Sequence, residues 1–329
     1  MLPSRYELTA DEARLHEFRI ASTDFCHVGH DLHRPECVVA LQDGSWIVSD
    51  HSAVVTCIRP DGTQHRYGRA SGLPNGFAID DRGELMVADL ANGAVLGLSA
   101  AGEVRTLYDR CEGQPLGAAN FVLADDEAAV RWITASTRRS PFQSAISHPL
   151  PDGRIYRADG PHLTLVADGL YFPNEMRVDR QRGAVYVVET TAGRISRAPL
   201  LAGDEVGEFS PFGPAPLYPG AYPDGLTLDE EGNLWITELS RNAILMLDMA
   251  GRLHAIFEDP TGKTLNKPTS LAFGGADLRT VAVGTLKMDV LPLFRSPVPG
   301  RPARHWRMNT RFGAWKSVKT PSVSRVGNS

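Results

Sequence analysis

One short pattern recurs six times along the chain, and its spacing constrains the fold more than any other feature. Each copy places a polar or small residue just after a proline or a turn, and alternating apolar residues follow it. The polar positions are Glu36, Asn75, Asn120, Asn174, Asp224 and Thr269, and the steps between them are 39, 45, 54, 50 and 45 residues. A period of about 40 to 50 residues is typical of β-propellers, in which each repeat forms one blade.

Further β-rich runs follow each polar position, and turns that mostly contain glycine separate them. After Asn174, for example, the Arg182-Gly183 turn precedes the run 185–188, and a third run covers 194–197. Such short, glycine-bounded strands are typical of antiparallel meanders. The sequence therefore predicts an all-β protein, a six-bladed β-propeller. A double β-sandwich would also contain many short strands, but it would not repeat one polar position at near-constant spacing.

We expect a single β-propeller domain over residues 1–329, with the six repeats at about 30–295 and a mobile tail at about 310–329. A propeller joins its two ends to close the ring, so strands are predicted near 18–20 and 303–308. The longest repeat step contains a polar, proline-rich loop from Ser136 to Pro151. We expect this loop to cover one mouth of the ring.

The charge balance argues against nucleic-acid partners. Lys and Arg number 34 against 39 Asp and Glu, which gives a formal net charge of -5 and no global basic field. The stretch 295–329 holds eight basic residues and no acidic one. A closing strand with a mobile end explains this stretch better than a nucleic-acid-binding tail does.

Hydropathy and cysteine usage predict the compartment. No run of about 18 apolar residues is present, and charged residues interrupt the first 15 positions, so no membrane partner or signal peptide is expected. The four cysteines are dispersed without a CxxC pair, which predicts reduced thiols rather than disulfides or a thiolate zinc site. We therefore expect a cytoplasmic protein; its oligomeric state is left open.

The six polar positions, called the polar ring from here on, predict a cation site. In a propeller the innermost strands begin beside the central channel, so equivalent residues converge on the axis. Carboxylate and carboxamide oxygens suit Ca²⁺, Mg²⁺ or Mn²⁺, and Glu36 with Asp224 would neutralise one divalent cation. Without a cation the two carboxylates would raise each other's pKa. The alternative is that Asn and Asp before Gly only form turns, which weighs most for Asn75.

Several motifs resemble the gluconolactonase/regucalcin (senescence marker protein) family of six-bladed propeller hydrolases. The motifs are Pro35-Glu36, Phe172-Pro173-Asn174 with Val185 to Thr190, Tyr222 to Leu226 with Gly232 to Ile236, and Thr269 to Gly275. The resemblance implies that Glu36, Asn174 and Asp224 hold one catalytic divalent cation, with calcium first and zinc, magnesium or manganese as alternatives. It also implies that Asn120 lies nearby at the substrate pocket.

This chain departs from the family pattern at two places. Glu36-Cys37-Val38 stands where Glu-Gly-Pro is common, and Asn174-Glu175 stands where Asn-Gly is expected. The segments 172–174 and 194–197 are equally similar to strictosidine-synthase-like relatives. These departures concern the substrate and the reaction rather than the fold.

The predicted function is a metal-dependent hydrolase that opens a lactone, with Asp224 as the general base that accepts a proton from water. The partner is a small-molecule substrate. We expect Asn75 and Asn120 to contact it, together with Arg138 and His148 of the long loop if an anionic or hydroxylated group must be bound.

Other functions stay open at this point. A propeller of this kind could instead hydrolyse organophosphates, act as a strictosidine-synthase-like protein, or bind proteins without catalysis. No Gly-x-Ser-x-Gly, HExxH, P-loop or dinucleotide motif is present. A second acidic column, Asp50, Asp89, Glu189 and Glu238, is expected to form hydrogen bonds within blade turns.

Overall fold

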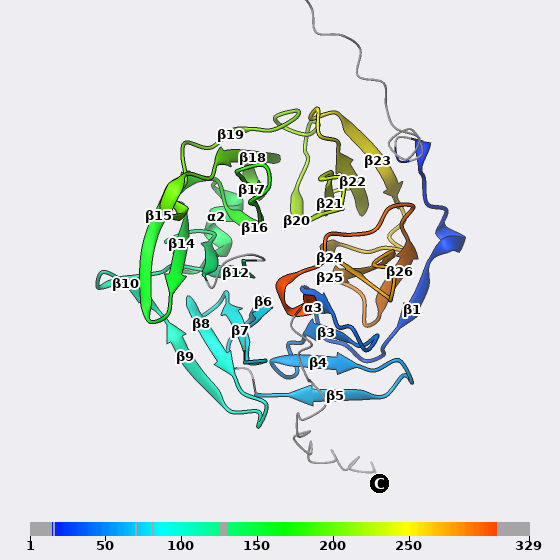
Figure 1. The fold of residues 1–329 in the computed structure, drawn as a ribbon, viewed down its shortest axis with the longest axis horizontal. Helices are drawn as coiled ribbons and strands as arrows, with labels where there is room; N and C mark the ends of the chain where they lie inside the picture. Colours follow the sequence, from blue (N-terminus) through cyan, green and yellow to red (C-terminus); the bar gives the residue numbers. More distant parts are fainter. Residues whose placement is uncertain (1–14, 16, 70, 81, 126–129, 308–329) are drawn as a thin grey trace, which may run out of the picture.

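The structure of the chain is a computed structural model that describes residues 15, 17–69, 71–80, 82–125 and 130–307. In this part of the chain, six four-stranded antiparallel sheets surround a central axis as the blades of a propeller (Figure 1). The prediction of an all-β, six-bladed β-propeller is confirmed. The tail predicted at about 310–329 lies outside the described residues.

The first three blades follow the chain in order, and each runs from the channel outward. Blade 1 consists of β2 (Val38–Ala40), β3 (Trp46–Ser49), β4 (Val55–Ile58) and β5 (Gln64–Tyr67). Blade 2 consists of β6 (Pro74–Ile79), β7 (Leu85–Asp89), β8 (Ala94–Leu98) and β9 (Val104–Tyr108). Blade 3 consists of β12 (Ala119–Ala124), β13 (Arg131–Ala135), β14 (Gly153–Asp159) and β15 (His162–Leu170). A small hairpin, β10 (Arg110–Cys111) and β11 (Gln114–Pro115), precedes blade 3.

The last three blades repeat this arrangement, and the sixth takes its outer strand from the start of the chain. Blade 4 consists of β16 (Pro173–Asp179), β17 (Ala184–Glu189), β18 (Arg194–Pro199) and β19 (Ser210–Pro211). Blade 5 consists of β20 (Pro223–Leu228), β21 (Leu234–Glu238), β22 (Ala243–Leu247) and β23 (Leu253–Glu258). Blade 6 consists of β24 (Pro268–Gly274), β25 (Thr280–Thr285), β26 (Leu291–Arg295) and β1 (Cys26–Val28).

Helices are short and lie outside the sheets. Those whose bounds lie within the described residues are η1 (Ser22–Asp24), α2 (Gln143–Ser147), η2 (Thr190–Ala192), η3 (Ala202–Asp204) and α3 (Arg304–Arg307). Among the described residues, none of the helices has the length and apolar character needed to cross a membrane.

The ring closes differently from the sequence prediction. β1 pairs with β26 and completes blade 6, whereas residues 18–20 are not a strand. Phe18 and Ile20 instead pack beside Trp235 and Phe257 on the outside of the ring. The predicted strand at 303–308 is also wrong, because Arg304–Arg307 forms the helix α3. Apolar residues of both segments pack against the blades. The sequence prediction mistook this apolar character for strand pairing.

The core is divided among the interfaces between blades. Buried aromatic side chains fill these interfaces, such as Trp235, whose ring centroid lies 5.7 Å from that of Phe273 and 6.2 Å from that of Phe294. The aspartates that end the repeat pattern support the next strand. The indole nitrogens of Trp132 and Trp235 each donate to such an aspartate at 3.0 Å. The repeat is thus explained by local turns and by packing between neighbouring blades.

The C-terminal described segment covers one mouth of the channel. Arg301 donates its backbone N–H to Leu228 at 3.0 Å, and its guanidinium lies 3.0 Å from the buried carboxylate of Asp179. His305 contacts the carbonyl oxygen of Ala40 at 2.7 Å, and Trp306 packs against blade 1. The segment therefore ties blades 1, 4 and 5 together across this mouth.

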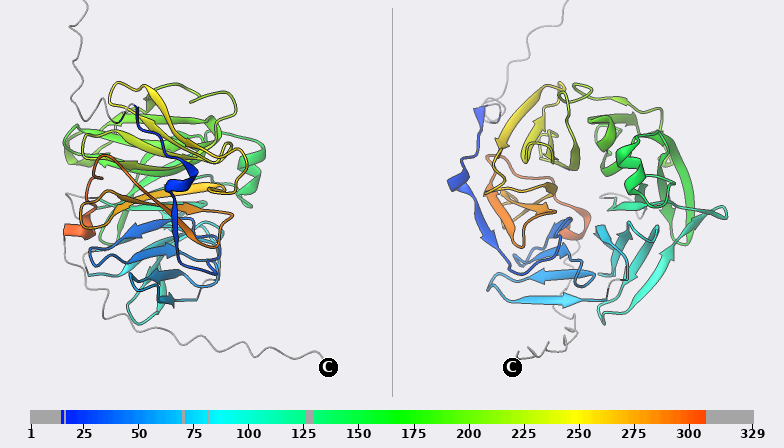
Figure 2. Two further views of the ribbon diagram at one scale, coloured as in Figure 1. Left: turned by 90° about the vertical axis from the view of Figure 1, so that its right-hand side faces the viewer. Right: turned by 180° about the vertical axis from the view of Figure 1, so that it is seen from behind.

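The long loop predicted at Ser136 to Pro151 belongs to the opposite mouth. Ala135, which precedes it, pairs with Ala119 beside the polar ring. The loop contains α2, and Figure 2 shows α2 and α3 on opposite faces of the ring. The loop therefore emerges on the face where the polar ring lies.

Candidate functional site

Backbone irregularities aim the polar ring into the channel. In blades 2 to 6 the register of the innermost strand shifts at or beside its polar-ring residue, as between Pro173 and Met176 and between Pro223 and Leu226. Such bulges interrupt pairing and redirect side chains. In blade 1, Glu36 lies just before β2. All six polar-ring residues are buried at the start of the innermost strands.

A chain of hydrogen bonds runs through the ring from blade 1 to blade 4. Arg34 donates to the Asn75 side-chain oxygen at 3.0 Å, and the Asn75 amide donates to the Asn120 side-chain oxygen at 3.0 Å. The Asn120 amide then donates to the Ser136 hydroxyl at 2.9 Å, and that hydroxyl donates to the Pro173 carbonyl at 2.8 Å. Asn75 and Asn120 are therefore held by polar partners within the channel and are more than turn formers.

Thr269 closes the ring between blades 6 and 1. Its hydroxyl donates to the Glu36 carbonyl oxygen at 2.7 Å. Gly284 stands beside this contact, and a Cβ there would lie 2.0 Å from the same oxygen. The backbone at Glu36 is thus fixed from two sides, which supports the orientation of its side chain.

Glu36, Asn174 and Asp224 come from three different blades and interact in the channel. The Asn174 amide donates to the Thr190 hydroxyl at 3.4 Å, and the Asn174 side chain acts to lower the pKa of Asp224. Burial is the main influence on Asp224 and, with the charges of Glu36 and Glu175, raises its pKa well above the ordinary value. Burial also raises the pKa of Glu36, and the charge of Arg34 opposes this change. The structure therefore brings the three predicted ligands together; that they hold a cation stays a prediction.

Three charged residues of the channel were missed by the sequence analysis as functional candidates. Glu175 directly follows Asn174 of the polar ring and is buried. Its carboxylate accepts a hydrogen bond from the Leu226 N–H at 3.1 Å and forms an ion pair with Arg177 at 3.1 Å. Arg34 contacts the carboxylate of Glu36. Glu175 gave a signal, because blades 2 and 5 have glycine at the same position. Arg34 gave none, because it precedes the repeat.

The donor set fits an oxygen-preferring divalent cation. The described residues contain no group of three His, Cys, Asp or Glu side chains placed to hold a metal, so a carboxamide such as Asn174 has to complete the set. Three buried carboxylates, Glu36, Glu175 and Asp224, face two guanidiniums, Arg34 and Arg177. One negative charge in excess, inside a site that raises carboxyl pKa values, favours a cation.

The two loop residues predicted to contact substrate, Arg138 and His148, are both exposed. The neighbouring Arg139 organises the loop instead: it donates to the His148 carbonyl at 2.9 Å and lies 3.3 Å from the Asp152 carboxylate. Ile146 and Leu150 expose apolar side chains on the same loop. The loop is therefore pinned at its base while its tip stays accessible; contacts of Arg138 and His148 with a substrate stay predictions.

The second acidic column forms hydrogen bonds in blade turns, as expected. Asp50 accepts from Thr56 at 2.6 Å, Asp89 from Leu73 at 2.9 Å and Glu238 from Tyr222 at 2.7 Å. Glu189 accepts from the N–H of Tyr171 at 2.8 Å. These residues orient the segments that lead into the innermost strands and are not part of the candidate site.

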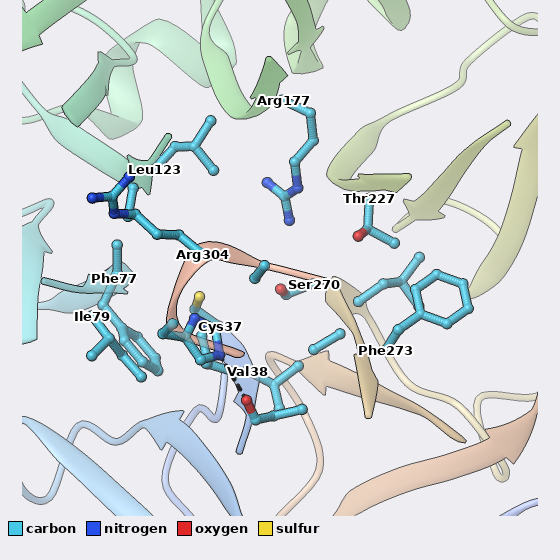
Figure 3. Close-up of a pocket in the computed structure, with 18 of the residues that line it drawn as sticks. Cys37, Val38, Phe77, Ile79, Leu123, Arg177, Thr227, Ser270, Phe273 and Arg304 are labelled. Carbon is cyan, nitrogen blue, oxygen red and sulfur yellow. Dashed lines mark hydrogen bonds between the residues drawn. The ribbon is translucent and has the colours of Figure 1, made fainter. Parts of the chain in front are cut away.

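A cavity of about 110 Å³ lies at the other end of the channel, beneath α3. Residues from all six innermost strands line it, and Arg177 extends into its middle from β16 (Figure 3). Burial raises the pKa of the Cys37 thiol in its wall. The Glu175–Arg177 pair lies between this mostly apolar cavity and the polar ring, so the two ends of the channel differ in chemistry.

The family model "SMP-30/Gluconolactonase/LRE-like region" matches residues 34–287. The pentonolactonase XacC of Haloferax volcanii is 28% identical over 232 residues, which cover 69% of this chain and 75% of that protein. Strictosidine synthase-like 10 of Arabidopsis thaliana is 28% identical over 194 residues, or 57% of this chain. The chain spans about half, 50%, of the length of that plant relative.

Solved structures support the fold. A gluconolactonase from Xanthomonas campestris superposes with a TM-score of 0.65 at 22% identity, covering 83% of this chain and 88% of the other. A calcium-binding regucalcin from Agrobacterium tumefaciens gives 0.66 at 17% identity, covering 85% and 98%. At such identities the likeness establishes the propeller and nothing finer.

Proposed function

Because the chain belongs to the SMP-30/gluconolactonase/LRE-like family, we propose that it is a metal-dependent hydrolase that opens a sugar lactone or a related cyclic ester. The meeting of Glu36, Asn174 and Asp224, from three blades, at one mouth of the channel carries this proposal. The match to a pentonolactonase over 75% of its length supports the substrate class.

In this proposal Glu36, Asn174 and Asp224 hold one divalent cation, with calcium first because the regucalcin relative is described as calcium-binding. Zinc, magnesium and manganese are the alternatives. The cation supplies Lewis-acid chemistry, which polarises an ester carbonyl and makes water more acidic. Its charge also favours the ionised form of Asp224, whose pKa is raised without it.

Side chains of the protein accept the proton and bind the substrate. A carboxylate oxygen of Asp224 accepts the proton of the attacking water as general base. Asn75 and Asn120, fixed by their mutual hydrogen bond, present carboxamides to the hydroxyl groups of the substrate. Arg138 and His148 reach the substrate from the accessible part of the loop.

The test is acid release from a panel of aldonolactones before and after exhaustive chelation, with elemental analysis of the purified protein. We expect hydrolysis that chelation removes and one cation restores. The same cation should raise the melting temperature. A cation at a free concentration of 100 times its Kd adds about 2.7 kcal/mol to the free energy of unfolding. Full activity after chelation would disprove the metal dependence.

A second candidate is a strictosidine-synthase-like activity, favoured by the match to the Arabidopsis relative. Under this candidate the protein would not hydrolyse lactones. The lactone panel separates the two candidates, because failure to release acid from any lactone, with or without added cations, would favour the second one.

The compartment is part of the same proposal. All four cysteines are free in the structure, and Cys37, Cys57 and Cys111 are buried. Free thiols support a reducing environment, and we place the protein in the cytoplasm on that ground.

A further inference from the structure

Arg34 holds a guanidinium at the polar ring. Its backbone is in the left-handed region, with φ 56, which a non-glycine residue adopts at a cost in free energy. The carbonyl of Arg34 accepts the N–H of Glu36 at 2.8 Å, so the chain turns tightly there. The turn places the guanidinium against the carboxylate of Glu36 and 3.0 Å from the Asn75 oxygen.

The guanidinium has donor capacity left over. Its two terminal nitrogens contact Glu36, Asn75 and the Pro74 carbonyl, the last at 3.4 Å. Among the described residues the structure assigns no partner to the Nε of Arg34, and the side chain is 22% exposed. A guanidinium has five N–H donors in a fixed plane, so a further acceptor can bind without breaking these contacts.

The charge balance shows what this acceptor would be. Arg177, the other guanidinium of the channel, is paired with Glu175 and stacked over Phe121 at 5.2 Å, on the inner side of the ring. Glu36 and Asp224 alone would balance one divalent cation. Arg34 therefore adds a positive charge that a neutral substrate does not need, whereas an anionic substrate would be attracted to it.

We propose that Arg34 selects lactones that carry a carboxylate outside the ring ester, such as lactones of sugar dicarboxylic acids. The inference rests on the proposed function, because it names the substrate class of the same site. Guanidinium and carboxylate form paired, charge-assisted hydrogen bonds with defined geometry, so the contact would orient the lactone as well as bind it. The same charge opposes the cation, so Arg34 lowers the affinity of the ring for a divalent ion.

The experiment compares wild type with Arg34→Gln, which removes the charge, and Arg34→Lys, which keeps the charge without the planar fork. Arg105→Gln is the matched control, since Arg105 makes an exposed ion pair with Glu84 on the outer strand of blade 2. Two measurements are made: kcat/KM for glucarolactone and gluconolactone, and calorimetric binding of Ca²⁺ alone to the chelated protein.

Arg34→Gln should lose about 10- to 100-fold in kcat/KM for glucarolactone and less than about threefold for gluconolactone. Its affinity for Ca²⁺ should rise about tenfold, because a like charge is removed. Arg34→Lys should keep part of the preference, and Arg105→Gln should match wild type. Equal losses on both lactones, or Ca²⁺ binding that is unchanged or weaker, would overturn the proposal.

A binding measurement separates this inference from the proposed function. If wild type hydrolyses neither lactone, the proposed function fails, yet calorimetry with glucarate and gluconate still tests Arg34. Wild type should then bind glucarate more tightly, and Arg34→Gln should remove the difference. If Arg34→Gln does not fold, Arg34→Lys decides the question. Selection by the guanidinium predicts that Arg34→Lys prefers glucarate over gluconate less than wild type does. If neither protein prefers glucarate, the proposal is refuted.

Discussion

The two mouths of the channel are built from opposite ends of the same six innermost strands, yet they differ in what they leave accessible. At the mouth beside α2, the strands begin with the buried polar ring and its carboxylates. At the mouth beside α3, the C-terminal segment ties three blades together and covers a mostly apolar cavity. The same kind of strand thus carries the candidate site at one end and contacts that join the blades at the other.

Substitution at the polar ring tests the first half of this comparison and has the largest expected effect. If the proposed cation is bound there, Glu36→Gln or Asp224→Asn should lower kcat/KM by about 10³-fold, because its Lewis-acid assistance, worth several kcal/mol, would be lost. The melting temperature of the chelated Asp224→Asn protein should not fall, since the change removes repulsion between buried carboxylates. Steady-state kinetics gives kcat/KM, and calorimetry gives the melting temperature. Asp168→Asn, on the outer strand of blade 3, is the control.

Substitution at the covered mouth should have the opposite result. Asp179→Ala removes the buried carboxylate that pairs with Arg301 at 3.0 Å and Arg182 at 3.1 Å. We expect a loss of about 2 kcal/mol in the free energy of unfolding, because the partly buried guanidinium of Arg301 loses its charge-assisted hydrogen bonds to Asp179. Urea unfolding gives this value, and kcat/KM of the folded protein should be unchanged. A large change in kcat/KM without a stability loss would mean that the two mouths are not separate in function.

The loop at the polar mouth sharpens the comparison with a smaller effect. Arg139→Ala removes the contacts to the His148 carbonyl and the Asp152 carboxylate. Loosening the loop should raise KM about tenfold for every lactone, about the value of one charge-assisted hydrogen bond. Arg138→Ala should instead raise KM mainly for anionic lactones if Arg138 contacts the substrate. If the two variants change KM in the same way for every lactone, then Arg139 does not differ from Arg138 in its role, which would contradict this prediction.

The smallest effect is the pH dependence of stability at the covered mouth. Burial acts to raise the pKa of Asp179, but hydrogen bonds and charge from Arg301, and then from Arg182, hold it below the ordinary value of 3.8. A depressed pKa adds stability above pH 3.8 that is lost as pH falls through the folded-state pKa. The stability gap between wild type and Asp179→Asn should therefore narrow below about pH 4. If the stability difference between the two proteins instead grows as the pH falls, the pKa of Asp179 is raised rather than lowered in the folded protein.

The sequence by itself determined the number of blades and the positions that face the channel. Both depend on local interactions repeated in every unit: a bulge at the polar position, alternating apolar residues, and an aspartate that supports the next strand, as Asp229 supports Trp235. Periodic local signals of this kind can be recognised without knowledge of distant contacts.

Only the tertiary structure decided which strand closes the ring, what covers the second mouth and which charges meet in the channel. β1 pairs with β26 from the far end of the chain, and Arg301 meets Asp179 from blade 4. Arg34 and Glu175 lie outside the repeated polar positions, and they become part of the candidate site only because the ring brings blades 1, 4 and 5 together. Long-range contacts between single residues carry no period, so the sequence pattern could not reveal them.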